Sequence, residues 1–181
     1  MKFDVLTLFP EMIEGYLQQG VLGRAINRGL VNVNLVNIRD FARGRHKTTD
    51  DRPYGGGEGM VMKPGPIYRA VKSVDRIEGT SQVILLSPQG KQFAQPMAWD
   101  MSQWNQVILI CGRYEGVDER IFANHIDLEL SVGDYILTGG ELGAMVVIDA
   151  VARLIPGVLG GERSSLEDSF EEGLLKYPQY T

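Results

Sequence analysis

Three glycine-bearing segments each follow a predicted strand and could bind a small molecule mainly through their main chain. They are Ser87-Pro88-Gln89-Gly90, Gly112-Arg113-Tyr114-Glu115-Gly116, and SVGDYILTGG from Ser131 to Gly140. Loops at the carboxyl ends of parallel strands build the ligand crevice of α/β proteins, and glycine lets a ligand approach the backbone closely. One such loop could be only a tight turn, but three at consecutive strand ends indicate a ligand site.

The form of these loops restricts the ligand. A dinucleotide fingerprint, G-x-G-x-x-G, would directly follow the first strand, but that strand ends Leu8-Phe9-Pro10 without a glycine. The chain also contains no G-x-x-x-x-G-K-[ST] string, which would bind a nucleotide's phosphates. The loops therefore favour a ligand without a polyphosphate, such as an adenosine derivative.

A polar stretch from Arg39 to Met60 carries the densest positive charge in the chain. Its basic residues stand among three aspartates, Asp40, Asp50 and Asp51; they are Arg39, Arg43, Arg45, His46, Lys47 and Arg52. Because the net charge is −5, binding of nucleic acid by bulk electrostatics is not expected. The stretch is either a local contact for phosphates or a solvated loop, and the sequence alone favours neither.

The elements that position these residues alternate between short apolar runs and helical patterns. Strands are predicted over 2–9, 31–35, 82–86, 106–111, 127–130 and 135–137, and helices over 11–19, 21–28, 66–77, 93–101, 117–124 and 141–155. Alternation of this kind predicts an α/β fold with a mainly parallel sheet.

Length and composition support one folded domain. The chain has 181 residues, of which 44% are hydrophobic and 23% charged, and it contains no apolar run of the roughly 18–20 residues that a membrane span needs. Its first ten residues include Asp4 and do not resemble a signal peptide. The single cysteine, Cys111, excludes an internal disulfide and a cysteine-based zinc site. No group of residues has a recognisable metal-ligand spacing, and a reducing, cytoplasmic location is expected.

Several longer strings resemble the bacterial tRNA (guanine-N1)-methyltransferases, the TrmD family of the knotted SPOUT superfamily. They begin in the first predicted strand and reach the last residue: LFPEM (8–12), DDRPYGGGEGMVMKP (50–64), LLSPQGKQF (85–93), CGRYEGVDER (111–120), SVGDYILTGGEL (131–142), IDAVARLIPGVLG (148–160) and EDSFEEGLLKYPQYT (167–181). Chance agreement of all these strings is negligible.

The resemblance implies an α/β fold with helices on both faces of the sheet and a deep trefoil knot. It also implies methyl transfer from S-adenosylmethionine (SAM) to N1 of guanosine 37 of tRNA, by a homodimer whose active sites lie at the subunit interface. By the same resemblance, the SAM pocket is built from Ser87, Pro88, Gly112, Tyr114, Glu115, Val132, Gly133, Asp134, Tyr135, Ile136, Leu137, Gly139 and Gly140.

Two residues match the family's catalytic pair. Asp168 corresponds to the general base and Arg153 to the residue that stabilises charge on O6 of guanine. Without the resemblance, we would interpret Asp168 as a surface residue in a solvated acidic run. Arg153 would be interpreted as a cation that stabilises the carboxyl end of a helix through the helix dipole. Weaker correspondences assign His46, Asp50, Tyr54 and Ser164 to the target RNA, and carboxylates at the site could recruit Mg²⁺.

The chain departs from the family pattern at two residues and in length. Glu58 and Gly143 stand where the family usually has proline. We expect residues 1–160 to form the SAM-binding domain and 161–181 to form a linker to a tRNA-binding domain that the family carries and this chain lacks. The alternative to an active methyltransferase is therefore a SAM-binding, dimerising domain with little activity. A nucleotide-dependent oxidoreductase is a third reading, against which the missing glycine fingerprint counts.

Overall fold

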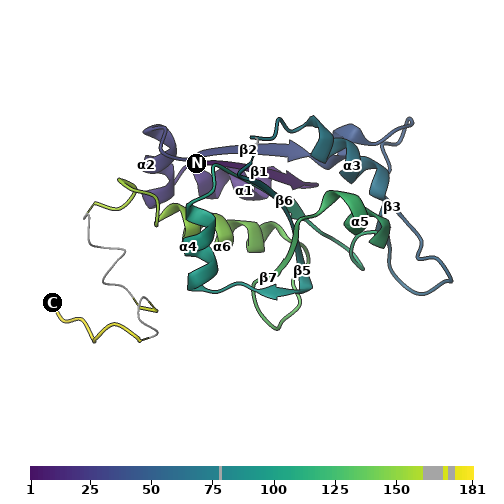
Figure 1. Ribbon diagram of the computed structural model, residues 1–181. Helices are drawn as coiled ribbons and strands as arrows, with labels where there is room; N and C mark the ends of the chain where they lie inside the picture. Colours follow the sequence, from purple (N-terminus) through teal and green to yellow (C-terminus); the bar gives the residue numbers. More distant parts are fainter. Residues whose placement is uncertain (78, 161–168, 171–173) are drawn as a thin grey trace.

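The computed structural model describes residues 1–77, 79–160, 169–170 and 174–181. Five parallel strands form the central sheet in the order β2-β1-β6-β5-β7 (Figure 1). Their bounds are Lys2–Thr7 for β1, Asn32–Asn37 for β2, Ser81–Gln92 for β5, Gln106–Cys111 for β6 and Leu128–Ser131 for β7. A separate antiparallel pair joins β3 (Asp50–Asp51) to β4 (Val61–Met62).

Burial explains the order of the strands. All six residues of β6 are buried, as expected for an apolar strand covered on both faces. Strand β2 alternates asparagine with apolar residues and lies at the edge of the sheet. The predicted α/β class with a mainly parallel sheet is confirmed.

Helices cover both faces of this sheet. On one face the apolar core contains residues of α1 (Glu11–Leu17), α2 (Gly20–Asn27), α4 (Gln95–Ser102) and α6 (Glu141–Ala152). On the other face it contains residues of α3 (Pro64–Ser73) and of the 3₁₀ turns η1 (Ile38–Phe41) and η2 (Glu119–Ile121), the latter leading into α5 (Phe122–His125). No helix among the described residues is long and apolar enough to cross a membrane.

The structure differs from the predicted elements at two of the glycine-bearing segments. Strand β5 does not end at Leu86 but continues to Gln92, and Leu86 and Lys91 both pair with Leu130 of β7. The four residues Ser87–Gly90 therefore leave the ladder as a bulge and return to it. Residues 135–137 form no strand; Tyr135 and Ile136 are 56% and 81% exposed, so their apolar side chains do not belong to the core. The trefoil knot stays a prediction.

Candidate functional site

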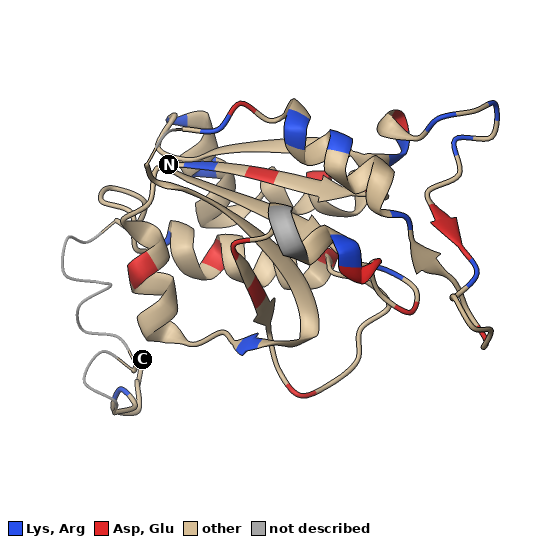
Figure 2. Ribbon diagram, turned by 45° about the vertical axis from the view of Figure 1, so that its right-hand side comes forward, with Lys and Arg blue, Asp and Glu red and all other residues tan. Residues whose placement is uncertain are grey.

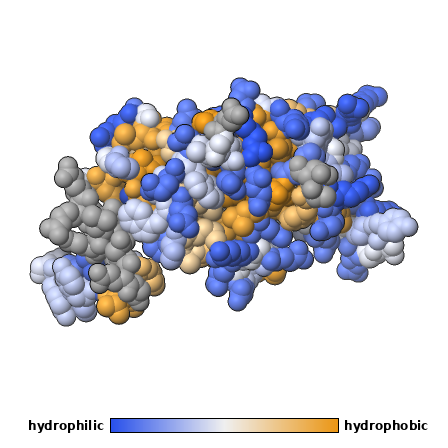
Figure 3. Space-filling model, viewed as in Figure 1, coloured by the Kyte–Doolittle hydropathy of each residue, from blue (hydrophilic) through white to orange (hydrophobic). Residues whose placement is uncertain are grey.

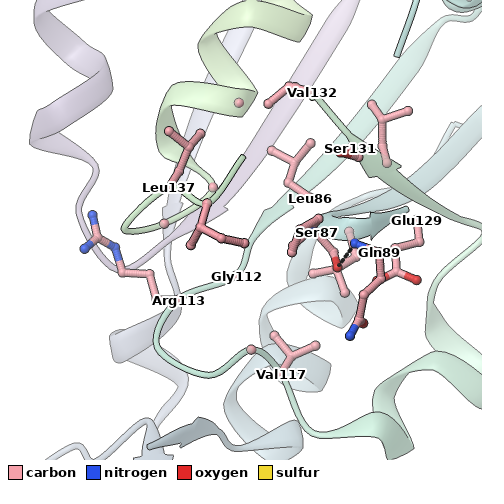
Figure 4. Close-up of a pocket in the computed structure, with 18 of the residues that line it drawn as sticks. Leu86, Ser87, Gln89, Gly112, Arg113, Val117, Glu129, Ser131, Val132 and Leu137 are labelled. Atoms are coloured by element: carbon pink, nitrogen blue, oxygen red, sulfur yellow. Dashed lines mark hydrogen bonds between the residues drawn. The ribbon is translucent and has the colours of Figure 1, made fainter. Parts of the chain in front are cut away.

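The three glycine-bearing segments meet at one end of three neighbouring strands. The first segment is the bulge within β5, and the other two follow β6 and β7; these three strands are neighbours in the sheet. Together the segments surround a cavity of about 520 Å³ (Figure 4). This volume lies within the usual range for a small-molecule site. The expected convergence of the segments follows from parallel pairing, which brings the carboxyl ends of all three strands to one edge.

Of the thirteen residues predicted for the SAM pocket, the cavity is lined by twelve. The exception is Asp134, whose neighbours Gly133 and Tyr135 both line it. The twelve are Ser87, Pro88, Gly112, Tyr114, Glu115, Val132, Gly133, Tyr135, Ile136, Leu137, Gly139 and Gly140.

Direct backbone contacts hold the segments together. The amide of Gly140 donates to the carbonyl of Gly112 at 2.9 Å, and Arg113 pairs with Gly139 in an isolated antiparallel bridge. Tyr114 has a φ of +62°, a left-handed conformation that is uncommon for a residue with a side chain. This conformation marks the second segment as a shaped turn between β6 and the 3₁₀ turn η2.

The cavity is acidic. Glu115, Glu119 and Glu129 line it, and Oε1 of Glu129 is a buried oxygen for which the described part of the chain offers no hydrogen-bond partner. The cationic side chain among the described lining residues, Arg113, is already paired with Glu141. Such a lining suits a positively charged ligand rich in hydrogen-bond donors and disfavours a polyphosphate. SAM, with its sulfonium and ammonium groups, fits this description.

Sequence reasoning missed part of this lining. Gln89, Val117, Glu119, Phe122 and Glu129 all line the cavity. Gln89 lies inside a segment already singled out, and Val117 and Glu119 follow another by only a few residues. One feature of the sequence could have identified Glu129: it is a lone carboxylate between two leucines in an apolar strand. Burial of a carboxylate in a sheet is unfavourable unless it has a partner, so its presence there points to a binding role.

Cys111, at the end of β6, belongs to the core and has no exposed surface. Burial, and secondly the negative charge of Glu141, raises the pKa of its thiol well above the usual value. A thiol held in this neutral form is a poor nucleophile.

Three of the residues predicted to contact RNA, His46, Asp50 and Tyr54, lie on a projecting segment whose carboxyl end is held beside the cavity. His46 and Tyr54 are exposed, Tyr54 completely, and Asp50 pairs with Met62 across β3 and β4. Met62 in turn donates to the carbonyl of Gly116, and Glu115 donates through its amide to Met60 at 2.9 Å. The segment is thus anchored on the second cavity loop.

Arg153 is far from the cavity of its own chain. It caps the carboxyl end of α6, whose amino end lies at the cavity through Gly140 and Gly143. Twelve residues at about 1.5 Å rise each separate these ends by about 18 Å, well beyond the reach of an arginine side chain. Asp168 and Ser164 lie outside the described residues. Of the predicted catalytic pair, the structure therefore describes Arg153 alone, and it places this residue away from the cavity of its own chain.

Metal ligands do not gather in the part of the chain that the structure describes: no three His, Cys, Asp or Glu side chains come close enough to hold an ion. A fully protein-caged metal is not supported there.

Comparisons with known proteins all point to the same family. The family model described as "tRNA (Guanine-1)-methyltransferase TrmD" matches residues 1–181. The chain is 52% identical to the tRNA (guanine-N(1)-)-methyltransferase of Staphylococcus epidermidis over 181 residues, which are all of this chain and 74% of that protein. It is 56% identical to the tRNA (guanine-N(1)-)-methyltransferase of Caldanaerobacter subterraneus, again over all of this chain and 74% of that protein.

A solved structure agrees with the fold as well. The crystal structure of tRNA (m1G37) methyltransferase from Aquifex aeolicus matches 98% of this chain and 80% of its own, with 40% identity and a TM-score of 0.81. With a family model over its full length and relatives above 50% identity, this chain belongs to the tRNA (guanine-1)-methyltransferase TrmD family.

Proposed function

We propose that this protein transfers a methyl group from SAM to N1 of guanosine 37 in tRNA. The observation that carries the proposal is the acidic cavity, lined by twelve of the thirteen residues expected to bind SAM, in a chain of the TrmD family. Relatives that are more than 50% identical over the 181 aligned residues are named tRNA (guanine-N(1)-)-methyltransferase, and the Aquifex protein is named for position 37.

Guanine N1 carries a proton at neutral pH, so methylation needs a base and a group that stabilises negative charge toward O6. Bound SAM supplies an electrophilic methyl group. In the proposal Asp168 accepts the N1 proton and the guanidinium of Arg153 stabilises the charge at O6. An aspartate near its reference pKa of about 3.9 is a weak base, so alignment of the reacting atoms has to supply much of the rate enhancement.

We propose further that the active site is completed by a second copy of the chain. Large apolar side chains are exposed on two adjacent helices and the residues before them: Phe9, Met12 and Tyr16 by α1, and Leu142 and Val146 on α6. The hydroxyl of Tyr16 donates to Asp149 at 2.7 Å and joins the two helices into one surface. We call these five residues the α1/α6 patch.

Helical spacing connects this patch to Arg153. Positions 142, 146, 149 and 153 follow one another at intervals of four, three and four residues, so they share one face of α6. An arginine about 18 Å from its own cavity, on the face that carries an exposed apolar patch, is suited to act in the cavity of a partner. This supports a homodimer with active sites at the interface.

The target nucleic acid is proposed to contact the projecting segment 42–60. Figure 2 shows its lysines and arginines as a series of blue positions along the right-hand segment, and the same end of the molecule is hydrophilic in Figure 3. Arg43, Arg45 and Arg52 are exposed, while Lys47 and Lys63 pair with Asp40 and Asp51. Exposed arginines suit the phosphates of RNA. A tRNA substrate also fits a cytoplasmic location.

The decisive experiment is transfer of labelled methyl groups from SAM to a tRNA with guanosine at position 37, followed by nucleoside analysis for N1-methylguanosine. We expect product with the wild type and a loss of about 100-fold or more with Asp168→Ala, as for removal of a general base. Asp100→Ala, which removes an exposed carboxylate on α4, should retain activity. If the wild type and Asp100→Ala both bind SAM but form no product, the non-catalytic alternative is favoured.

The same assay tests the expectation of Mg²⁺. Mg²⁺ commonly binds through one or two carboxylates together with water, so a requirement for it need not involve a cluster of three ligands. Activity that is unchanged by a chelator would remove the metal from the proposal.

A further inference from the structure

We propose that Arg113 is a positioning residue for the cofactor cavity: it fixes the spacing between the second and third cavity loops through the buried carboxylate of Glu141. This inference rests on the proposed SAM site but assigns a role to two residues outside the expected binding and catalytic sets. It comes from the direction of the Arg113 side chain, which leads away from the cavity while its backbone lines it (Figure 4).

The ion pair is nearly enclosed. Nη2 of Arg113 lies 3.1 Å from Oε2 of Glu141, and Nε donates to the same carboxylate at 3.2 and 3.3 Å. The side chains are 15% and 1% exposed. A planar guanidinium that meets a carboxylate with two nitrogens fixes orientation as well as distance, so the pair defines how the two loops lie relative to each other.

Glu141 is the point where three strand ends meet. It is the first residue of α6 and directly follows the third cavity loop. Its Oε1 accepts a 2.7 Å hydrogen bond from Oγ1 of Thr7 at the end of β1, and that hydroxyl accepts the amide of Phe9 at 2.9 Å. Arg113 brings the end of β6 to the same carboxylate.

The outer side of the guanidinium is packed as well. It lies over the ring of Phe9, 4.2 Å from the ring centroid, and Nη2 contacts Sδ of Met12 at 3.3 Å. Both residues belong to the α1/α6 patch. Lysine could retain the charge at position 113 but neither the fork toward Glu141 nor the flat stacking on Phe9, so the geometry is specific to arginine.

The test measures SAM affinity by titration calorimetry and thermal stability on the same samples. For Arg113→Met we expect SAM affinity to fall about tenfold or more, and for Arg113→Lys by about threefold, because small displacements of binding groups are costly. The matched control is Arg120→Met, which breaks an exposed pair with Asp118 on the segment that follows the same loop; its affinity should stay unchanged.

A double variant separates positioning from simple stabilisation. Arg113→Met alone leaves a buried carboxylate without its partner, and adding Glu141→Gln removes that charge. We expect the double variant to regain melting temperature but not SAM affinity. Recovery of both would overturn the inference, as would wild-type affinity in Arg113→Met. If Arg113→Met does not fold, wild-type affinity in Arg113→Lys would overturn it. Absence of SAM binding in the wild type would instead refute the proposed function.

Discussion

Gly140 lies against the main chain of a neighbouring strand rather than against open ligand space. A Cβ at this position would fall 2.7 Å from the Cα of Cys111 and 3.2 Å from its Cβ. The sequence suggested that glycines in the cavity loops admit a ligand; at this residue the close approach is made by the protein's own backbone. A shift of this backbone contact would also change the shape of the cavity, because Gly112, Gly139 and Gly140 all line it.

We therefore expect Gly140→Ala to lower the free energy of unfolding by about 2 kcal/mol, as overpacking typically does, and to weaken SAM binding at the same time. Urea unfolding and calorimetry measure the two effects. Gly143→Ala is the matched control in the same helix turn: its nearest neighbours are methyl groups of Val132 at 3.6 Å, an ordinary contact. This change should be neutral or stabilising by up to about 1 kcal/mol. Equal effects from both variants would contradict the argument.

Among the elements, β5 departs most from a regular strand. Its bulge at Ser87–Gly90 supplies the first cavity loop without ending the strand, since β5 pairs with Leu130 of β7 both before and after it. The two backbones come so close that a Cβ on Gly90 would fall 2.3 Å from the amide nitrogen of Leu130. The same few residues thus form a cavity wall and a close backbone contact between β5 and β7.

Gly90→Ala should consequently destabilise the fold by about 3 kcal/mol or more, at the upper end of overpacking costs, because backbone atoms of β7 cannot move aside as a side chain could. Chemical denaturation followed by circular dichroism measures this loss. Lys91→Ala, an exposed neighbour in the same strand, should change stability by less than about 0.5 kcal/mol. A Gly90→Ala protein as stable as the wild type would contradict this close contact between β5 and β7.

For the whole molecule, the α1/α6 patch and Arg153 link activity to self-association. Leu142, 50% exposed, would be buried at the proposed interface, where a carboxylate without a partner is strongly unfavourable. Leu142→Glu should therefore shift the protein to monomers in analytical ultracentrifugation and abolish methyl transfer. Ile77→Glu alters an apolar side chain of similar exposure, 39%, outside the patch and should leave association intact. A wild-type monomer with full activity would contradict the dimer.

The charge distribution gives a second prediction at this scale. Although the net charge is −5, exposed arginines concentrate on one projecting segment, so RNA affinity should depend on local contacts. Arg43→Ala and Arg45→Ala should each weaken tRNA binding and reduce the slope of log affinity against log salt concentration by about 1. Filter binding over a salt series measures this slope. Lys72→Ala, which removes an exposed lysine from α3, is the control, and an equal effect there would contradict a localised contact.

Local pattern was sufficient for much of the fold. Strand β6, strand β2 and helix α6 were predicted to within about three residues of their observed bounds, because hydrophobic periodicity reflects burial directly. The predicted strand over 135–137 was wrong, because the apolar side chains there line a cavity and do not pack in a sheet. Periodicity records that a side chain avoids water, but not what it contacts.

By itself the sequence determined the family, the parallel α/β class and the three segments that line the cavity, because each is carried by short strings of neighbouring residues. Only the tertiary structure decided that β5 continues through its bulge, that Glu129 lines the cavity and that Glu141 contacts both Arg113 and Thr7. It also put Arg153 at the far end of α6 from its own cavity. These features depend on contacts between segments up to 134 residues apart in the chain, and the strength of such contacts is set by burial and distance, which no local pattern encodes.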